Sequence, residues 1–246
     1  MPETISLRAR DGADVETLLF VPKGDGPSPA VVIGAEGTGI TRVVRDVAGE
    51  LAGRGFVVAV PDFFRGAAPE DPEDLSDIEA VMATIGALDF RRATHDLIDA
   101  VEYLRTLPNV DPARVATWGY CTGATLALLA AELDPHLAAA VLFYPSQPTF
   151  DVLDDRKPVH PIDLMWNLRC PTLLIYGDQD VVMPPERLHD LGQRIHRWGV
   201  DVEIVSYAGA GHAFCTDYPG FLHAGAAQQA QSDALAFAGR HLGAPS

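Results

Sequence analysis

The chain is poor in basic residues and in long apolar runs, and each shortage argues against one class of binding partner. Its 246 residues hold 18 Lys and Arg against 34 Asp and Glu, a formal net charge of −16. Nucleic-acid phosphates are bound through Lys and Arg, so this balance argues against a nucleic-acid partner. No apolar run approaches the roughly 18 to 20 residues needed to cross a bilayer, and we expect no membrane partner.

Cysteine is scarce as well. Three cysteines, an odd number without regular spacing, do not make the disulfide framework of a small secreted protein. The N-terminus shows no secretory signal pattern, so we expect the protein in the reducing cytoplasm. Neither His-Glu-x-x-His nor Cys-x-x-Cys occurs, so we expect no metal site, and the chemistry inferred below requires no cofactor.

Short apolar runs alternate with helical segments, a pattern typical of βαβ units around a parallel sheet. The length suits one large α/β domain, and no linker divides residues 1–246. We predict a mostly parallel central sheet of about seven or eight strands flanked by helices. The predicted strands are 17–21, 30–33, 57–60, 115–118, 138–143, 172–176 and 203–207. The predicted helices are 41–53, 92–107, 122–133, 185–198 and 221–241.

Two stretches interrupt this alternation. Residues 64–91 contain an acidic segment, and residues 145–170 are rich in proline. Long irregular segments in compact domains are often functional, yet solvated surface loops explain both stretches equally well. We therefore treat them as candidate insertions near the functional site.

The most informative motif is a Gly-x-nucleophile-x-Gly pentapeptide with cysteine at its centre, Gly119-Tyr120-Cys121-Thr122-Gly123. A predicted strand precedes it and an Ala- and Leu-rich helix follows it, which is the setting of a nucleophile elbow. The tight turn strains the backbone of the nucleophile, so its neighbours must be small. Cys121 is therefore the candidate nucleophile, and its thiol needs a nearby base to ionise at neutral pH.

A base and an orienting acid follow in the order known from α/β-hydrolases, which is nucleophile, acid and histidine. His212 lies directly after the last predicted strand, and two acids, Asp178 and Asp180, follow the strand before it. We favour Asp180 as the orienting acid because of its place in a Gly-x-x-Asp-x-x-x-Pro pattern. Asp178 is then a turn residue that caps backbone amides. Cys121, Asp180 and His212 all lie past the carboxyl ends of predicted strands, where parallel sheets place their sites.

Glu36 is another acid in a special position, in the glycine-rich loop after the predicted strand 30–33. In hydrolases of this kind that loop lends one backbone N–H to the oxyanion hole, and the residue after the nucleophile lends the other. These donors would be Gly37 and Thr122. From position alone, Glu36 is as readily a surface acid in a turn as a functional group.

Together these motifs resemble the dienelactone hydrolase family, also called carboxymethylenebutenolidases. The resemblance covers about residues 3–242 and rests on Ala35-Glu36-Gly37, Val60-Pro61-Asp62-Phe63, Gly119 to Gly123, Gly177 to Pro184 and Gly211-His212-Ala213-Phe214. It implies the α/β-hydrolase fold and a triad of Cys121, His212 and Asp180, with Glu36 helping the thiol to lose its proton. It also implies that Tyr144 lines the pocket, and we expect Tyr120 and Phe214 to bind substrate with it.

One departure from the family concerns the substrate. Members that bind the carboxylate of dienelactone carry an arginine four positions after the catalytic histidine, where this chain has Thr216. Threonine cannot supply the charge of an arginine–carboxylate clamp. We therefore expect hydrolysis of another small lactone or activated ester through a thioester on Cys121. Acyl transfer, and non-catalytic ligand binding or redox sensing through Cys121, are the alternatives. For the oligomeric state, we expect a monomer or a homodimer.

Overall fold

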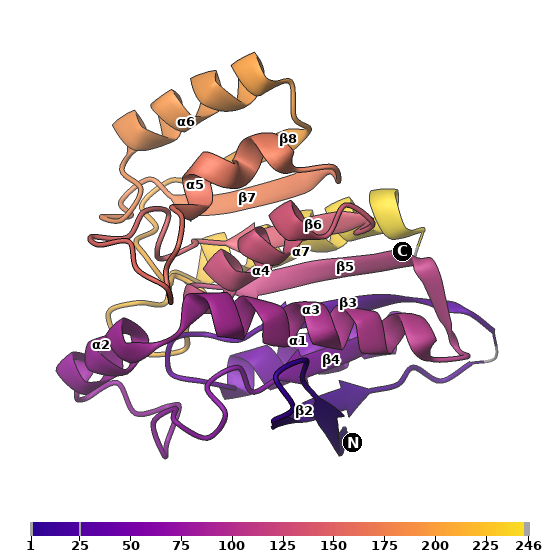
Figure 1. Ribbon diagram of the computed structural model, residues 1–246. Coiled ribbons are helices and arrows are strands. Elements are labelled where there is room, and N and C mark those ends of the chain that lie inside the picture. The colour runs from indigo at the N-terminus through magenta and orange to yellow at the C-terminus, as the bar shows by residue number, and fades with distance from the viewer. Residues whose placement is uncertain (1, 25, 244–246) are drawn as a thin grey trace.

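An eight-stranded, mostly parallel sheet forms the centre of the protein (Figure 1). The computed structural model describes residues 2–24 and 26–243. The strands are β1 (Glu3–Arg8), β2 (Asp14–Phe20), β3 (Ser28–Gly34), β4 (Val57–Pro61), β5 (Val110–Tyr120), β6 (Ala139–Phe143), β7 (Thr172–Gly177) and β8 (Val202–Tyr207). Their order is β1-β2-β4-β3-β5-β6-β7-β8, and only the pairs β1–β2 and β2–β4 are antiparallel. The predicted α/β class and strand number are confirmed.

Helices cover both faces of this sheet. They are α1 (Arg42–Gly53), α2 (Ile78–Ala87), α3 (Phe90–Thr106), α4 (Thr122–Leu133), α5 (Pro161–Leu164), α6 (Pro185–Trp198) and α7 (Ala224–Leu242), with a 3₁₀ turn at Met165–Asn167. In Figure 1, α3, α4 and α6 lie in front of the sheet, and α1 and α7 lie behind it. Every residue of β4, β6 and β7 is buried, as expected for parallel strands covered on both sides.

Local sequence explains where the main helices lie. Ala93, Leu97, Val101 and Leu104 recur at helical spacing in α3, and all four are fully buried against the sheet. The hydroxyl of Thr41 accepts a hydrogen bond from the Val44 N–H at 3.3 Å and so begins α1. In the described part of the chain, no helix combines the length and apolar character needed to span a membrane.

Strand β1, helices α2 and α5 and the 3₁₀ turn were not predicted, and α7 begins later than expected. Strand β1 pairs with β2 at the edge of the sheet, and α2 lies inside the acidic segment of residues 64–91. Helix α7 begins at Ala224 rather than at residue 221, because the His223 ring accepts a hydrogen bond from the Ala226 N–H at 3.2 Å and caps the helix there. This correction leaves Phe221 in a loop, where it lines the cavity described below.

Candidate active site

Cys121 lies in a strained turn between β5 and α4. Its backbone φ of 50° and ψ of −116° are unusual for a residue with a side chain. The glycines around it allow the turn to pack, since a Cβ on Gly123 would lie 2.1 Å from the Ala35 carbonyl oxygen. A Cβ on Gly119 would lie 2.5 Å from the Gly123 carbonyl oxygen. The glycine spacing therefore has a steric cause, and it presents the Cys121 thiol at the carboxyl edge of the sheet.

His212 connects Cys121 to Asp180. Its Nε2 lies 3.4 Å from the Cys121 Sγ, and its Nδ1 lies 2.9 Å from an Asp180 carboxylate oxygen. The other Asp180 oxygen accepts hydrogen bonds from the N–H groups of Val182 and Met183, at 2.8 and 3.4 Å. Asp180 is 1% exposed, so its carboxylate is held in place and oriented toward the imidazole.

Asp178 has a different environment. One of its oxygens accepts the Gly209 N–H at 2.8 Å and the side-chain amide of Gln179 at 3.0 Å. These contacts close the turns after β7 and β8, which is the capping role that the sequence favoured for Asp178. Of the two candidate acids, Asp180 is the one that contacts His212.

The surroundings favour a charged pair of Cys121 and His212. Burial by itself would raise the pKa of the Cys121 thiol, but the charge and hydrogen bond of His212 outweigh burial and leave that pKa below its ordinary value. Burial by itself would lower the pKa of His212. The Cys121 thiolate and Asp180 raise it to about 10. Each partner therefore favours the charged form of the other, which shifts the pair toward thiolate and imidazolium.

Glu36 is buried beside this pair, with 5% of its surface exposed. Its Oε1 accepts a hydrogen bond from the Thr216 hydroxyl at 2.6 Å, and its Oε2 is buried without a partner among the described residues. Burial raises the pKa of Glu36, so the neutral acid is favoured next to a thiolate. Glu36 is thus no surface acid, and Thr216 occupies one of its oxygens.

The two expected oxyanion donors both lie at this site. Thr122 begins α4, so its N–H has no partner within the helix and is available to a bound oxygen. Its hydroxyl lies 3.9 Å from the Cys121 Sγ and 3.3 Å from the Ser146 hydroxyl. Gly37 lines the same cavity, and a Cβ there would lie 2.4 Å from the Ile85 side chain. A side chain at position 37 would therefore have to displace the Ile85 side chain of α2.

A cavity of about 210 Å³ opens over Cys121 and His212. One wall comes from the segment 64–91 and consists of apolar side chains, namely Leu75, Ile78, Val81, Met82 and Ile85. Val182, Ala213 and Phe221 extend the apolar lining on other sides. The ionisable groups among the lining residues are Glu36, Cys121 and His212. Neither Lys nor Arg belongs to this lining, so the cavity suits an uncharged, apolar group.

The structure corrects the expected substrate-binding residues, since Tyr120, Tyr144 and Phe214 do not line this cavity. Tyr120 stacks on Phe143 with ring centroids 4.6 Å apart and accepts the Trp118 indole N–H at 3.0 Å. Tyr144 is fully buried behind His212, with ring centroids 5.4 Å apart, and Phe214 packs against it. All three support the site from the core instead of facing the cavity.

The cavity wall on α2 was missed, although its sequence carries a usable signal. Ile78, Val81, Met82 and Ile85 recur at i, i+3, i+4 and i+7, the spacing of one helix face. Acidic residues stand before and between these apolar positions and give the segment the composition of a solvated loop. Asp77 in fact caps the helix, since its carboxylate accepts the Ala80 N–H at 2.9 Å.

Across residues 2–24 and 26–243, no group of three His, Cys, Asp or Glu could hold a metal ion.

This sheet, with Cys121, Asp180 and His212 in contact on loops after its strands, has the architecture of the α/β-hydrolase fold. The sequence model of the dienelactone hydrolase family matches residues 15–242, and the chain belongs to this family. The resemblance noted in the sequence is thereby confirmed, and the protein is a hydrolase of the dienelactone hydrolase type.

Individual relatives agree with this assignment. The chain is 33% identical over 224 residues to a Bradyrhizobium sp protein named "Probable 2-oxo-3-(5-oxofuran-2-ylidene)propanoate lactonase", covering 91% of this chain and 88% of that one. It is 32% identical over 219 residues to a Salmonella typhimurium "Putative carboxymethylenebutenolidase", covering 87% and 79%. The crystal structure of a "Putative Dienelactone Hydrolase" from Klebsiella pneumoniae superposes with a TM-score of 0.86 at 26% identity, covering 98% of both chains.

Proposed function

We propose that the protein hydrolyses a small lactone or activated ester through a thioester on Cys121. The observation that carries the proposal is the unbroken line of contacts from Asp180 through His212 to the Cys121 sulfur, at 2.9 and 3.4 Å. The lowered pKa of Cys121 supports a thiolate nucleophile. A relative named as a lactonase supports the substrate class.

In the acylation step, the Cys121 thiolate attacks the substrate carbonyl and forms a carbon–sulfur bond. The N–H groups of Gly37 and Thr122 stabilise the negative charge that develops on the carbonyl oxygen. When the carbon–oxygen bond breaks, the His212 imidazolium gives its proton to the leaving oxygen. The neutral alcohol or enol departs, or remains attached in the case of a lactone, and the acyl group stays on Cys121 as a thioester.

In the deacylation step, the now neutral His212 takes a proton from water, and the resulting hydroxide attacks the thioester carbonyl. The carbon–sulfur bond breaks, the carboxylic acid leaves, and Cys121 and His212 return to the charged pair. Because thiolate is itself a good leaving group, the tetrahedral adduct formed by attack of Cys121 returns easily to the substrate unless the leaving oxygen is stabilised. We therefore propose substrates with stabilised leaving groups, such as enol-lactones and aryl esters.

Glu36 and Thr216 support an uncharged substrate next to the thiolate. A carboxylate on the substrate would meet Glu36, with no Lys or Arg in the cavity lining to neutralise it. Thr216 donates its hydroxyl to Glu36 and offers no positive charge. The neutral form of Glu36, favoured by burial, avoids repulsion with the Cys121 thiolate. We propose that, when Cys121 starts protonated and Glu36 ionised, Glu36 accepts the thiol proton and is thereby left in the neutral form that its burial favours.

Turnover of a panel of enol-lactones and p-nitrophenyl esters tests the proposal. Cys121→Ala is expected to lower the rate by at least about a thousandfold, because the nucleophile is lost. Cys170→Ala is the matched control, since burial raises the pKa of the Cys170 thiol to about 11 and makes it unreactive. Retention of most activity by Cys121→Ala would contradict the mechanism.

A further inference from the structure

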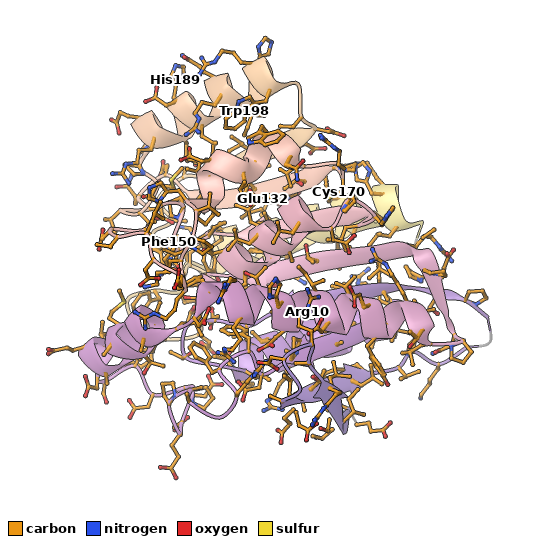
Figure 2. All side chains as sticks on the ribbon, viewed as in Figure 1. Arg10, Glu132, Phe150, Cys170, His189 and Trp198 are labelled. Atoms are coloured by element: carbon orange, nitrogen blue, oxygen red, sulfur yellow. The ribbon has the colours of Figure 1, made fainter. Side chains whose placement is uncertain are left out.

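A second groove of about 490 Å³ adjoins the cavity over Cys121 and His212. The two spaces share four lining residues, Met82, Ile85, Ser146 and Gln147. Phe150 lines this groove, and Figure 2 shows it among the loops after β6, on the same side of the molecule as α2. The cavity alone is smaller than the roughly 300 to 1,000 Å³ typical of ligand sites. A substrate that filled only the cavity would leave this adjoining surface unused.

Charged side chains distinguish the groove from the cavity, since Asp151, Asp154, Arg156 and Lys157 line it. The Lys157 ammonium donates a hydrogen bond to the Gly86 carbonyl at 3.0 Å, and lies 5.6 and 5.7 Å from the ring centroids of Phe90 and Phe150. Arg156 also lines the groove, but its guanidinium pairs with Asp154 at 3.4 Å. Lys157 forms no ion pair with the described residues, and an ammonium has three N–H donors. It can therefore donate to a ligand oxygen.

The position of His212 indicates which part of a substrate reaches this groove. The leaving oxygen must lie near the His212 Nε2, which donates the proton. No residue of the His212 loop lines the groove, whereas Ser146 does, and its hydroxyl lies 3.3 Å from the Thr122 hydroxyl beside the oxyanion hole. The groove therefore begins on the side of the carbonyl away from the leaving group. An acyl substituent would extend into it.

We infer that the groove, which we call the acyl groove, binds the acyl part of the substrate beyond the reacting carbonyl. Lys157 donates there to an oxygen acceptor at the far end of the acyl chain, either a carbonyl or a carboxylate. The body of the acyl chain passes along Met82 and Ile85 and over the Phe150 ring. This inference rests on the proposed function and adds a second recognition point to it.

The test compares kcat/KM for p-nitrophenyl butanoate with values for p-nitrophenyl esters of adipate, suberate and sebacate. The dicarboxylates are used both as free acids and as methyl esters, which separates a carboxylate ligand from a carbonyl ligand. Lys157→Met is expected to lower kcat/KM for the best of these long esters about tenfold, the value of a hydrogen bond from a charged donor. Lys157→Arg retains most of that rate, and butanoate changes by less than about twofold.

Two further variants make the result specific. Lys23→Met removes the other lysine of the chain. Lys23 is exposed and precedes β3, at the opposite ends of the parallel strands from Cys121. All substrates should keep their rates in this variant. Thr149→Trp places a large side chain in the acyl groove and should slow the long esters while sparing butanoate.

Equal losses for butanoate and long esters in Lys157→Met would overturn the inference, because Lys157 would then act only by anchoring α2 through Gly86. No loss for any long ester would overturn it as well. Acylation of Cys121 by p-nitrophenyl butanoate would show that the proposed function holds even when either of these results overturns the acyl groove. If no ester acylates Cys121, the proposed function falls, and the acyl groove with it.

Discussion

The proposed catalytic residues and the apolar wall of the cavity are supported in different ways. Cys121, Asp180 and His212 follow strands of the sheet, and backbone contacts fix each turn. Helix α2, in contrast, buries Val81 and Ile85 alone among its ten residues. The catalytic machinery is thus built on the sheet, whereas the wall is attached to it. Substitutions on α2 should change which substrates enter, and substitutions at the sheet edge should change the chemical step.

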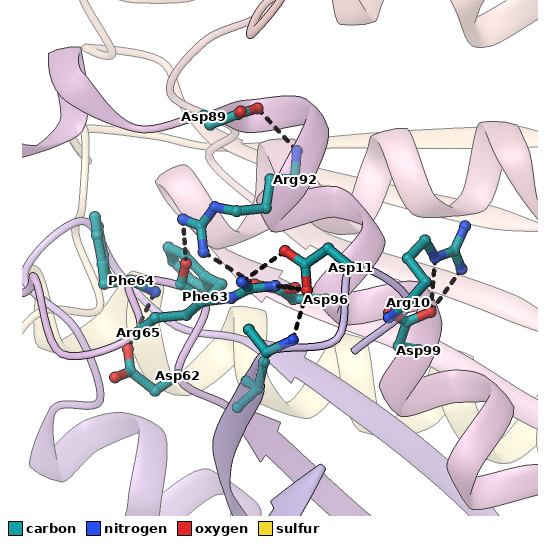
Figure 3. A network of polar contacts seen from close by, with 12 residues as sticks. Arg10, Asp11, Asp62, Phe63, Phe64, Arg65, Asp89, Arg92, Asp96 and Asp99 are labelled. Carbon is teal, nitrogen blue, oxygen red and sulfur yellow. Dashed lines mark hydrogen bonds and ion pairs between the residues drawn. The ribbon is translucent and has the colours of Figure 1, made fainter. Parts of the chain in front are cut away.

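The attachment of the α2 segment is polar, and Figure 3 shows its network. Arg65 precedes α2 and binds Asp96 of α3 at 2.5 and 3.0 Å. Arg92 follows α2, binds Asp96 at 3.3 Å and donates to the Phe63 carbonyl at 3.0 Å. One buried carboxylate therefore joins the two ends of the segment, while the helix between them remains lightly packed.

The largest expected effect separates Asp180 from Asp178. Asp180→Asn should lower kcat by roughly a thousandfold or more, since the amide cannot stabilise the His212 imidazolium. Asp178→Asn keeps the acceptor for Gly209 and should stay within about threefold of the wild type. Steady-state kinetics on an aryl ester measures both. Similar losses for the two variants would remove the distinction between the catalytic acid and the turn residue.

The polar attachment of α2 should be the next most sensitive feature. Asp96→Asn is expected to lower the free energy of unfolding by about 3 kcal/mol, because Asp96 is 1% exposed and its loss leaves Arg92 without its ion pair and Arg65 with Asp11 alone. Asp99→Asn is the matched control. Asp99 pairs with Arg10, which is 42% exposed, and should cost about 1 kcal/mol or less. Urea denaturation checks both, and equal costs would contradict the comparison.

The wall itself should tolerate change. Met82 is 56% exposed, so Met82→Ala should alter the free energy of unfolding by less than about 0.5 kcal/mol. Because Met82 lines the cavity and the acyl groove, KM for apolar esters should rise several-fold with kcat nearly unchanged. A large fall in kcat would show that α2 contributes to the chemical step.

The pH dependence should report the charged pair at the sheet edge. Activity should rise as the pH passes upward through the lowered pKa of Cys121, because the thiolate forms there. It should fall above about pH 10, where His212 loses the proton that the leaving group needs. Since Asp180 helps to raise the pKa of His212, Asp180→Asn should move the upper limb to lower pH. A profile of kcat/KM for both proteins measures the shift.

The loops after the strands, where Cys121, Asp180 and His212 lie, were easier to predict from sequence than the α2 wall, for physical reasons. A nucleophile elbow needs glycine at fixed positions, since any Cβ on Gly119 or Gly123 would collide with backbone, so the sterics appear directly as a motif. Strand β1 was missed because it lies at the edge and buries Leu7 alone among its six residues. A strand covered on both faces shows a near-continuous apolar run, whereas β1, with its single buried residue, shows none.

The misplaced aromatic residues illustrate a different limit. Tyr144 follows β6 with a positive φ of 41°, which turns its ring behind His212 rather than toward the substrate. Residue order along the chain carries no direct sign of that turn. The opening of the cavity likewise depends on how α2 packs over Gly37. Only the three-dimensional contact between these distant segments reveals it.

Intact-protein mass spectrometry after rapid quenching tests the central claim most directly. Wild-type protein mixed with an aryl ester should gain the mass of the acyl group, and peptide mapping should place that mass on Cys121. Cys121→Ala should show neither the adduct nor turnover. Sustained turnover by Cys121→Ala, or an adduct on any other residue, would contradict covalent catalysis by this thiol.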